Sequence, residues 1–537
     1  MSRSDNGKNR IFGFARTLSG QGPGGVCCAE EGYEEYIAAK SPAEEELAAQ
    51  RREDFSGMPV IAIAMAGEGG DKLRRLTEGS LREQTYSRWI LYQVQMKEDF
   101  DFIMYMWPGD TLRPDALYIF AKNAEGSDLI FCDEDRLEQG RRRDPLFKPC
   151  LDRATQYSFD MLCHGVMASR TLFEAAGGMT GDTGCDRYAY NLRLTDRCGS
   201  ARHIQEVLYT ACGRRDIGPE GRQALEKHLE KNDGIRVFPG EWRGSFRVEA
   251  IIRRPSAAIV IYNKNSHLPL MRLLNSMDGS LKGEKQVEII IADGGSADSR
   301  TLKYYDILRR NGAAKVFCGE GLPLPALLNA AAKEADRENC LFMDSGVEAL
   351  GIGWLHDMLS QSCRRGCGGA GPKLIGQDGR LIYTGTTIGI GGWQGSLYAG
   401  TPDDGESGQK LRFTDTLRAV SALSWVCMMT PTDLFFNVGC FDESFDEAGF
   451  DTEYCTRLDR RGYSLIYAPN VVMRYHGRIR SMAEAGGQDR MRYYDTVRET
   501  LIRGDPRYNN NFDYALQVPR IVPRPRSGAE LNELYKK

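Results

Sequence analysis

Acidic residues follow two predicted strands in the second half of the chain. The apolar run 287–292 ends in Asp293-Gly-Gly-Ser296, and the run 340–343 ends in Asp344-Ser-Gly346. In an open α/β sheet, ligands bind beyond the carboxyl ends of the strands. There, Asp293 could accept hydrogen bonds from a base or ribose hydroxyl, and Asp344 could hold a divalent metal that bridges two phosphates. The structural alternatives are an ordinary loop at 293–296 and a turn cap at Asp344.

A third acidic group lies in residues 441–453, directly before a predicted helix at 454–461, and it ends in Asp451 and Glu453. Carboxylates in a first helical turn are favoured by the helix dipole, which is the structural explanation. The functional one is a general base that takes a proton from a hydroxyl within hydrogen-bonding distance. His476 closes the run 470–475; a single histidine is more often structural, so its role depends on its neighbours.

The elements that position these residues alternate between short apolar runs and helical patterns from Pro59 onward, as in βαβ units. A strand at 60–64 precedes a helix at 72–84, which we expect to bury Leu73, Leu76 and Leu81. The same order returns with a strand at 257–261 and a helix at about 268–277. The pattern predicts an α/β fold with mostly parallel sheets.

An internal repeat supports two copies of one α/β domain. Residues 173–179 and 190–194 in the first half correspond to 435–441 and 454–458 in the second. Each pair is followed by a strand pair, at 204–212 and at 464–475. The first copy is the shorter, and it lacks residues within its sheet-forming half.

Composition excludes several classes of protein. The chain has 537 residues, and at roughly 150 residues per domain it should contain about three to four units. It is 41% hydrophobic with a net charge of −4, so nothing indicates nucleic-acid binding. It has no apolar stretch long enough for a membrane span and no secretory signal pattern. The 15 cysteines are therefore expected to be reduced, in a cytoplasmic protein.

We predict four segments: an N-terminal appendage at 1–57, α/β domains at 58–250 and 251–480, and a C-terminal helix and tail at 481–537. The appendage should contain an acidic helix at about 30–52 that packs on a later domain through Tyr33, Tyr36, Ile37 and Leu47. The tail from 505 onward includes three arginines among prolines at 519–526. A solvated tail is the first interpretation, and contact with an anionic membrane surface is the second.

Taken in order, the motifs resemble glycosyltransferase family 2, whose members have the GT-A fold, and most closely the tandem bacterial enzymes of surface-polysaccharide synthesis. The first copy has Asp133-Glu-Asp135, Gly140-Arg141 and Pro145-Leu-Phe-Lys-Pro149. The second has Gly371-Pro-Lys-Leu374, Asp378-Gly379, Gly389-Ile-Gly-Gly392 and Gly439-Cys-Phe-Asp-Glu443. The likeness covers about residues 58–480. It implies two tandem GT-A-like, Rossmann-like domains, of which the first is shortened and degenerate.

The resemblance also implies roles for single residues. Asp451, with Glu453 two residues later, falls at the catalytic base, and His476 falls at a late metal ligand. The nucleotide-sugar donor would be bound by Asn263, Asp293, Ser296 and Asp344, and the divalent cation (Mn²⁺ or Mg²⁺) by Asp344 and His476. The implied reaction is an inverting transfer to a bacterial surface glycan or its lipid-linked precursor.

Departures from the family pattern leave a second hypothesis open. Gly346 stands where the metal motif has a second aspartate, Trp425 replaces a glycine beside the acceptor, and Thr384 replaces a histidine. The first copy has Trp107-Pro-Gly-Asp110 in place of the metal motif and Asp186-Arg-Tyr-Ala-Tyr190 in place of the acidic pair. The alternative is therefore a non-catalytic pseudo-glycosyltransferase that acts as a scaffold or glycan-binding subunit.

Overall fold

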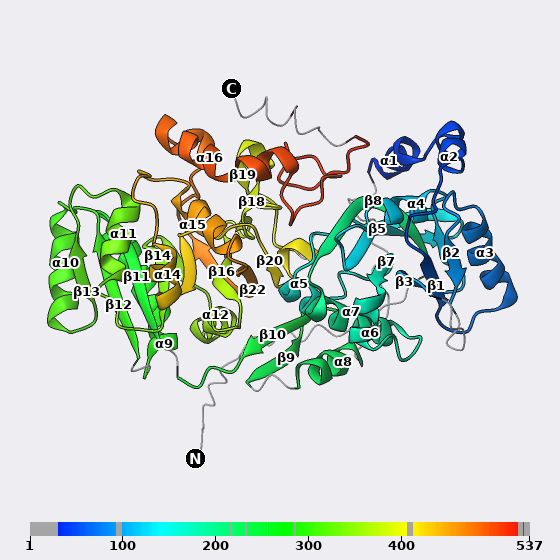
Figure 1. Ribbon diagram of the computed structural model, residues 1–537. Helices are drawn as coiled ribbons and strands as arrows, with labels where there is room; N and C mark the ends of the chain where they lie inside the picture. The colour runs from blue at the N-terminus through cyan, green and yellow to red at the C-terminus, as the bar shows by residue number, and fades with distance from the viewer. Residues whose placement is uncertain are drawn as a thin grey trace, which may run out of the picture.

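The computed structural model describes residues 31–92, 99–213, 217–218, 220–230, 234–254, 256–283, 286–404, 412–524 and 530. It contains two α/β units, each built on its own sheet: a first unit at 61–212 and a second at 257–475. Figure 1 shows the two units side by side, with α16 (Gly487–Arg503) and the C-terminal segment along one side of the molecule. The predicted α/β class with two tandem sheets is confirmed.

The first sheet has the strand order β2-β1-β3-β7-β5-β8-β4, with β6 paired to β5. Its β1 is parallel to β2 and β3, and β5 is parallel to β8, whereas β7 runs antiparallel to both neighbours. The strands are β1 Ile61–Met65, β2 Trp89–Leu91, β3 Phe102–Met106, β4 Thr111–Leu112, β5 Leu129–Glu138, β6 Arg141–Leu146, β7 Val166–Ser169 and β8 Ala201–Cys212. The helices are α3 Asp71–Arg82, α4 Ala116–Lys122, α5 Arg153–Ser158, α6 Arg170–Ala176 and α7 Gly184–Arg197.

The second sheet has the order β13-β12-β11-β14-β21-β16-β22-β15, with β17 paired to β16 and β20 paired to β22. The strands are β11 Ala257–Asn263, β12 Val287–Asp293, β13 Lys315–Cys318, β14 Asn339–Asp344, β15 Val347–Ala349, β16 Cys367–Ile375, β17 Leu381–Tyr383, β20 Arg418–Ala419, β21 Cys427–Pro431 and β22 Ser464–Tyr475. The helices are α9 His267–Leu281, α10 Ser299–Arg310, α11 Leu324–Ala332, α12 Trp354–Ser362, α14 Thr432–Val438 and α15 Phe450–Asp459. A small hairpin pairs β18 Thr387–Ile388 with β19 Gln394–Gly395.

The apolar strand β11 shows why the second sheet carries helices on both faces. Successive side chains of a strand point to opposite faces. Ala258 and Val260 accordingly belong to the core under α11, α14, α15 and α16, and Ile259 and Ile261 belong to the core under α9, α10 and α12. A strand buried on both faces reads as a continuous apolar run, which is what the sequence shows.

The two units are joined by α8 Glu220–Leu229 and the hairpin of β9 Ile235–Pro239 and β10 Phe246–Ala250. They also contact directly: Ser464 Oγ donates to Asp152 at 2.9 Å, and the Ala419 backbone N–H donates to Thr155 Oγ1 at 3.2 Å. Residues about 300 apart in the sequence therefore lie against one another.

The structure corrects three expectations, of which the first two concern the terminal segments. The acidic helix is two helices, α1 Tyr33–Lys40 and α2 Glu44–Gln50, because Pro42 between them has no N–H to donate to a helical hydrogen bond. Tyr33 and Tyr36 are buried against Phe147, as expected for the appendage, and Phe147 contacts Phe512.

The second correction concerns the chain beyond α16 (Gly487–Arg503). A solvated tail from residue 505 is wrong as far as residue 521, because Tyr508, Phe512, Tyr514 and Ile521 are buried in the cluster that holds α1. Residues 525–529 and 531–537 lie outside the described part of the chain.

The third correction concerns α3. Of its three predicted core leucines only Leu81 is buried, and Leu73 and Leu76 are exposed. The helix instead packs through small polar residues: Thr77 Oγ1 donates to the Trp107 carbonyl and accepts the N–H of Gly109. A prediction from the spacing of apolar residues misplaces the buried face of a helix when hydroxyl groups make the contacts with the rest of the protein.

Candidate active site

A pocket of about 600 Å³ lies at the edge of the second sheet where β14 ends, between that edge and the start of α15. Both of the acidic residues singled out above as metal ligand and base, Asp344 and Asp451, line it. Aromatic and basic side chains complete the wall, among them Tyr262, Trp425, Tyr475, Lys264, Arg478 and Arg480. The pocket therefore combines carboxylates, cations and apolar rings.

Asp451 is the second residue of α15, which begins after Gly449 in the left-handed region at a φ of 89°. Its side chain is buried, with 8% of the residue exposed. One carboxylate oxygen accepts the Trp425 N–H at 3.2 Å, and the other accepts the Thr452 N–H at 2.8 Å. Burial nevertheless raises the pKa of the Asp451 carboxyl to about 6. A carboxylate with this pKa is suited to general-base catalysis near neutral pH.

Glu453 does not line this pocket in the described structure. Its carboxylate forms a two-pronged ion pair with Arg457, one turn along α15, with both N–O distances at 2.7 Å. Arg457 in turn donates to the carbonyls of Val438 and Cys440. These contacts tie α15 to the segment before it, which is a structural role.

Asn263 and Asp293, which are buried, and Ser296, which is partly exposed, form a cluster beside the pocket, joined to it through Gly294, a pocket-lining residue. Asp293 accepts hydrogen bonds from Ser296 Oγ at 2.5 Å and from the Tyr305 hydroxyl at 3.0 Å. Asn263 Nδ2 donates to the same Tyr305 hydroxyl at 2.7 Å. Asn263 Oδ1 is buried without a hydrogen-bond partner among the described residues, so this cluster has an acceptor that is not satisfied internally.

Asp344 has the oxygen chemistry that a hard divalent cation prefers. Its Oδ1 accepts the Gly346 N–H at 2.7 Å, and Oδ2 has no hydrogen-bond partner in the described part of the chain. Burial raises the pKa of the Asp344 carboxyl, and the Gly346 N–H opposes that shift. Asp344 therefore fits as one ligand of a cation in this pocket.

His476 lies beside the turn that follows Asp344, since its backbone N–H donates to the Gly346 carbonyl at 3.0 Å. Its imidazole is engaged elsewhere. Nε2 lies 2.8 Å from a Glu348 carboxylate oxygen, and Nδ1 lies 2.6 Å from the Gln377 amide nitrogen. His476 would join Asp344 at a cation only after turning away from Glu348.

In the described part of the chain, one group of side chains is close enough to share a metal ion. It consists of Glu134, Cys163 and His164 of the first unit. Two cationic side chains already occupy it. The Lys148 ammonium lies 2.9 Å from Glu134, and the Arg187 guanidinium lies 2.8 Å from His164 Nε2. Because a metal would be repelled by both, we interpret this group as a buried charge network.

Comparisons with known proteins were made by sequence and by structure, and no protein-family model matches the chain. The O-antigen biosynthesis protein RfbC of Myxococcus xanthus is 26% identical in an alignment of 451 residues that covers 80% of this chain and 35% of that protein. This chain is similar to an O-antigen biosynthesis protein. An uncharacterized protein, y4gI of Sinorhizobium fredii, is 27% identical over 458 residues, 76% of this chain and 49% of that one. The chain thus spans half or less of the length of these curated relatives.

Among solved structures, GalNAc-T7 with UDP, GalNAc and Mn²⁺ matches 45% of this chain and 48% of its own, at 18% identity and a TM-score of 0.36. The mannosyltransferase PcManGT from Pyrobaculum calidifontis, in complex with GDP-Man and Mn²⁺, matches 47% of this chain and 64% of its own, at 13% identity and a TM-score of 0.32. The similarity in sequence to an O-antigen biosynthesis protein agrees with the expected resemblance to proteins of surface-polysaccharide synthesis. Among the described residues, no helix is both long and apolar enough to cross a bilayer.

Proposed function

We propose that the second unit is an inverting glycosyltransferase that moves a sugar from a nucleotide-sugar donor to a bacterial surface glycan or its lipid-linked precursor. The observation that carries this proposal is that Asp344 and Asp451 line one pocket, with the pKa of Asp451 raised to about 6. The similarity to an O-antigen biosynthesis protein supports the same class of reaction.

In this mechanism the acceptor hydroxyl lies within hydrogen-bonding distance of Asp451, which takes its proton as the oxygen attacks the anomeric carbon. The bond from that carbon to the diphosphate breaks in the same step, and its electron pair leaves with the diphosphate. The N–H groups of Trp425 and Thr452 hold the Asp451 carboxylate in place during the transfer. A single displacement inverts the anomeric configuration.

The donor would extend from the Asn263, Asp293 and Ser296 cluster toward Asp344. Its nucleoside would meet the unsatisfied oxygen of Asn263 and the carboxylate of Asp293. Lys264, which lines the pocket, would place positive charge near the diphosphate. Arg478 and Arg480 line it too, and they would do the same after leaving their ion pairs with Glu484 and Glu447. A divalent cation held by Asp344, and by His476 after it turns, would neutralise charge on the departing diphosphate.

The alternative proposal, a non-catalytic scaffold or glycan-binding subunit, is favoured by the engagement of His476 with Glu348 and Gln377. With Gly346 in place of a second carboxylate, and of the two metal ligands that the resemblance implies, Asp344 is then the one that is not engaged by another side chain among the described residues. This alternative predicts that no nucleotide binds in a metal-dependent way.

Calorimetry of the full chain with uridine, thymidine and guanosine diphosphates, each with and without Mn²⁺, separates the two proposals. The transferase should bind one nucleotide, more tightly with metal, and Asp293→Ala should weaken that binding. Asp306→Ala, on the exposed face of α10, is the matched control and should bind as the wild type does. If a well-folded chain binds none of the three nucleotides, the scaffold is the better proposal.

A further inference from the structure

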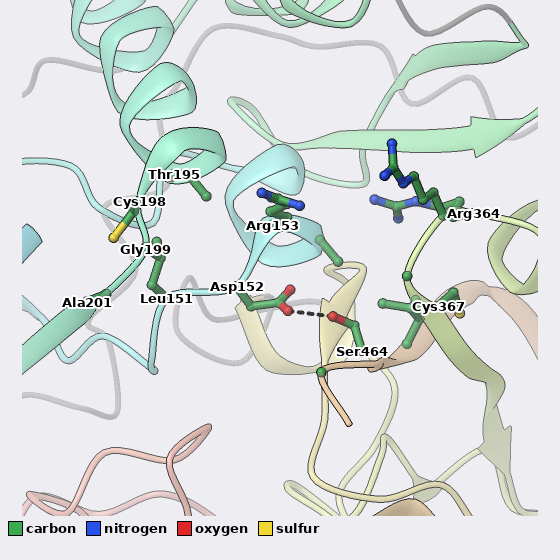
Figure 2. A pocket seen from close by; sticks show the side chains of 15 residues that line it. Leu151, Asp152, Arg153, Thr195, Cys198, Gly199, Ala201, Arg364, Cys367 and Ser464 are labelled. Atoms are coloured by element: carbon green, nitrogen blue, oxygen red, sulfur yellow. Dashed lines mark hydrogen bonds between the residues drawn. The ribbon is translucent and has the colours of Figure 1, made fainter. Parts of the chain in front are cut away.

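A second pocket, of about 340 Å³, lies between the two units. Its walls include the starts of β16 and β22 in the second unit and the start of α5 in the first, shown in Figure 2. β14 and β16 run in the same direction, because both pair antiparallel with β21. Cys367 at the start of β16 therefore lies at the opposite sheet edge from Asp344 at the end of β14. The pocket is separate from the candidate active site.

Positive charge is in excess in this interunit pocket. Three arginines line it, Arg153, Arg364 and Arg365, against one carboxylate, Asp152. Both oxygens of Asp152 are already used: one accepts the Thr155 N–H at 3.1 Å, and the other accepts Ser464 Oγ at 2.9 Å. In Figure 2, Arg153 and Arg364 lie on the same side of that Asp152–Ser464 hydrogen bond.

The three arginines differ in how far the protein satisfies them. Arg153 is paired with Asp196, with Nε 3.2 Å from a carboxylate oxygen. Arg364 is partly buried and donates to the neutral amide oxygen of Gln361 at 3.1 Å. No carboxylate of the described residues forms an ion pair with it, and Asp152 attracts it only from a longer distance. Burial lowers the pKa of the Arg364 guanidinium. Arg365 is exposed and is also without an ion pair in the described part of the chain.

We propose that this pocket binds a phosphorylated small molecule of about the size of a sugar phosphate, with Arg364 and Arg365 on the phosphate group. A guanidinium fork matches phosphate oxygens in pairs, and an anion would balance the excess of arginine over carboxylate in the pocket. The volume lies within the range of small-molecule sites. Because both units form the walls, the ligand would also stabilise their contact. The proposal does not depend on the transferase activity.

The test is calorimetry of the full chain with inorganic phosphate, glucose 6-phosphate, glucose and glucuronate, repeated in Asp293→Ala, in which the proposed nucleotide site is weakened. Phosphate and glucose 6-phosphate should bind and glucose should not. Arg365→Gln and Arg364→Gln should each weaken phosphate binding about tenfold, the loss of one charged hydrogen bond. Arg310→Gln, on the exposed end of α10, is the control and should bind as the wild type does.

Arg365 is exposed, so Arg365→Gln tests the site even if Arg364→Gln fails to fold. The proposal is overturned by absence of phosphate binding, by unchanged affinity in Arg365→Gln, or by tighter binding of glucuronate than of glucose 6-phosphate. Loss of UDP binding with phosphate binding retained would count against the proposed transferase and leave this pocket supported.

Discussion

The strands of the two sheets pair in the same register, so residues of the first unit can be matched with residues of the second. At two matched positions the side chains differ in chemistry. Ile61 pairs with Phe102 in the first unit as Ala257 pairs with Asn339 in the second, and the same spacing brings Trp107 to the position of Asp344. The repeat at Tyr190 and Tyr454 likewise brings Arg187 to the position of Asp451.

In the second unit these positions are two carboxylates that line a pocket. In the first they are an indole and a guanidinium, and the Arg187 guanidinium lies 5.9 Å from the centre of the Trp107 ring. Arg187 also pairs with buried Asp160 at 2.9 Å. The fold has thus kept its strand order while large side chains fill the equivalent site. A single fold therefore holds a hollow site in one copy and a packed core in the other.

The largest expected effect is on the activity of the second unit, whose site is a pocket. Asp451→Asn should lower the transfer rate by about 10²- to 10⁴-fold, because the amide cannot accept the acceptor proton. It should also stabilise the fold. The rise of the Asp451 pKa to about 6 means that the ionised carboxylate destabilises the fold by about 3 kcal/mol, and the neutral amide removes this penalty. Loss of one N–H hydrogen bond offsets about 1 kcal/mol of it. Steady-state kinetics and urea unfolding measure both, and full activity in this variant would contradict the assignment.

Arg187→Met tests the structural role of the matched position in the first unit, where side chains fill the site. Removing one partner of a buried ion pair costs about 3 to 5 kcal/mol, because Asp160 is left charged and unpaired. We expect a large fall in the free energy of unfolding, with transfer activity per folded molecule unchanged. Arg197→Met, exposed on the same helix, is the control and should unfold as the wild type does. A selective loss of activity at unchanged stability would instead place the first unit in the catalytic machinery.

The pH dependence of transfer and of stability tests the raised pKa of Asp451 in the second unit. Because the base must be deprotonated, transfer should fall about tenfold per pH unit below about 6. The stability term has the opposite sign. Folded Asp451 binds its proton more tightly than the unfolded chain, so its ionisation destabilises the fold above about pH 6, and the penalty is relieved as pH falls toward 4. Subtracting the unfolding free energies of Asp451→Asn from wild type across pH 4 to 8 isolates this term. A pH-independent difference would show that the pKa is not raised.

Gly346→Asp tests whether the metal motif can be restored. A second carboxylate beside Asp344 should tighten Mn²⁺ binding about tenfold, since affinity rises with the charge of the ligand set. A Cβ at position 346 would lie 2.9 Å from Asp344 Oδ1, so the existing hydrogen bond must shift slightly. Gly346→Ala introduces the same crowding without the charge. Equal Mn²⁺ affinity in both variants would show that the pocket is not built for a cation.

Much of this arrangement could be predicted from the sequence because it follows from strand order. Parallel strands end at one edge, so Asp293 and Asp344 were expected to lie there, whereas the role of Asp451 as base was implied by the resemblance to glycosyltransferase family 2. Lys264, Arg478 and Arg480 were missed, because they lie in irregular segments where no periodicity indicates the direction of a side chain. The burial of residues 505–521 was missed for a related reason, since short aromatic contacts between distant segments leave no local pattern.

The smallest expected effect separates two carboxylates of a single helix. Glu453→Gln keeps the size of the side chain and removes the ion pair with Arg457, which lies outside the pocket. An i,i+4 pair of this kind contributes about 0.5 kcal/mol, so stability should fall by about that amount. Transfer should change less than about threefold, against the large loss in Asp451→Asn. If instead both variants lose activity equally, the pair acts as a unit, and the pocket must extend to Glu453 when substrate is bound.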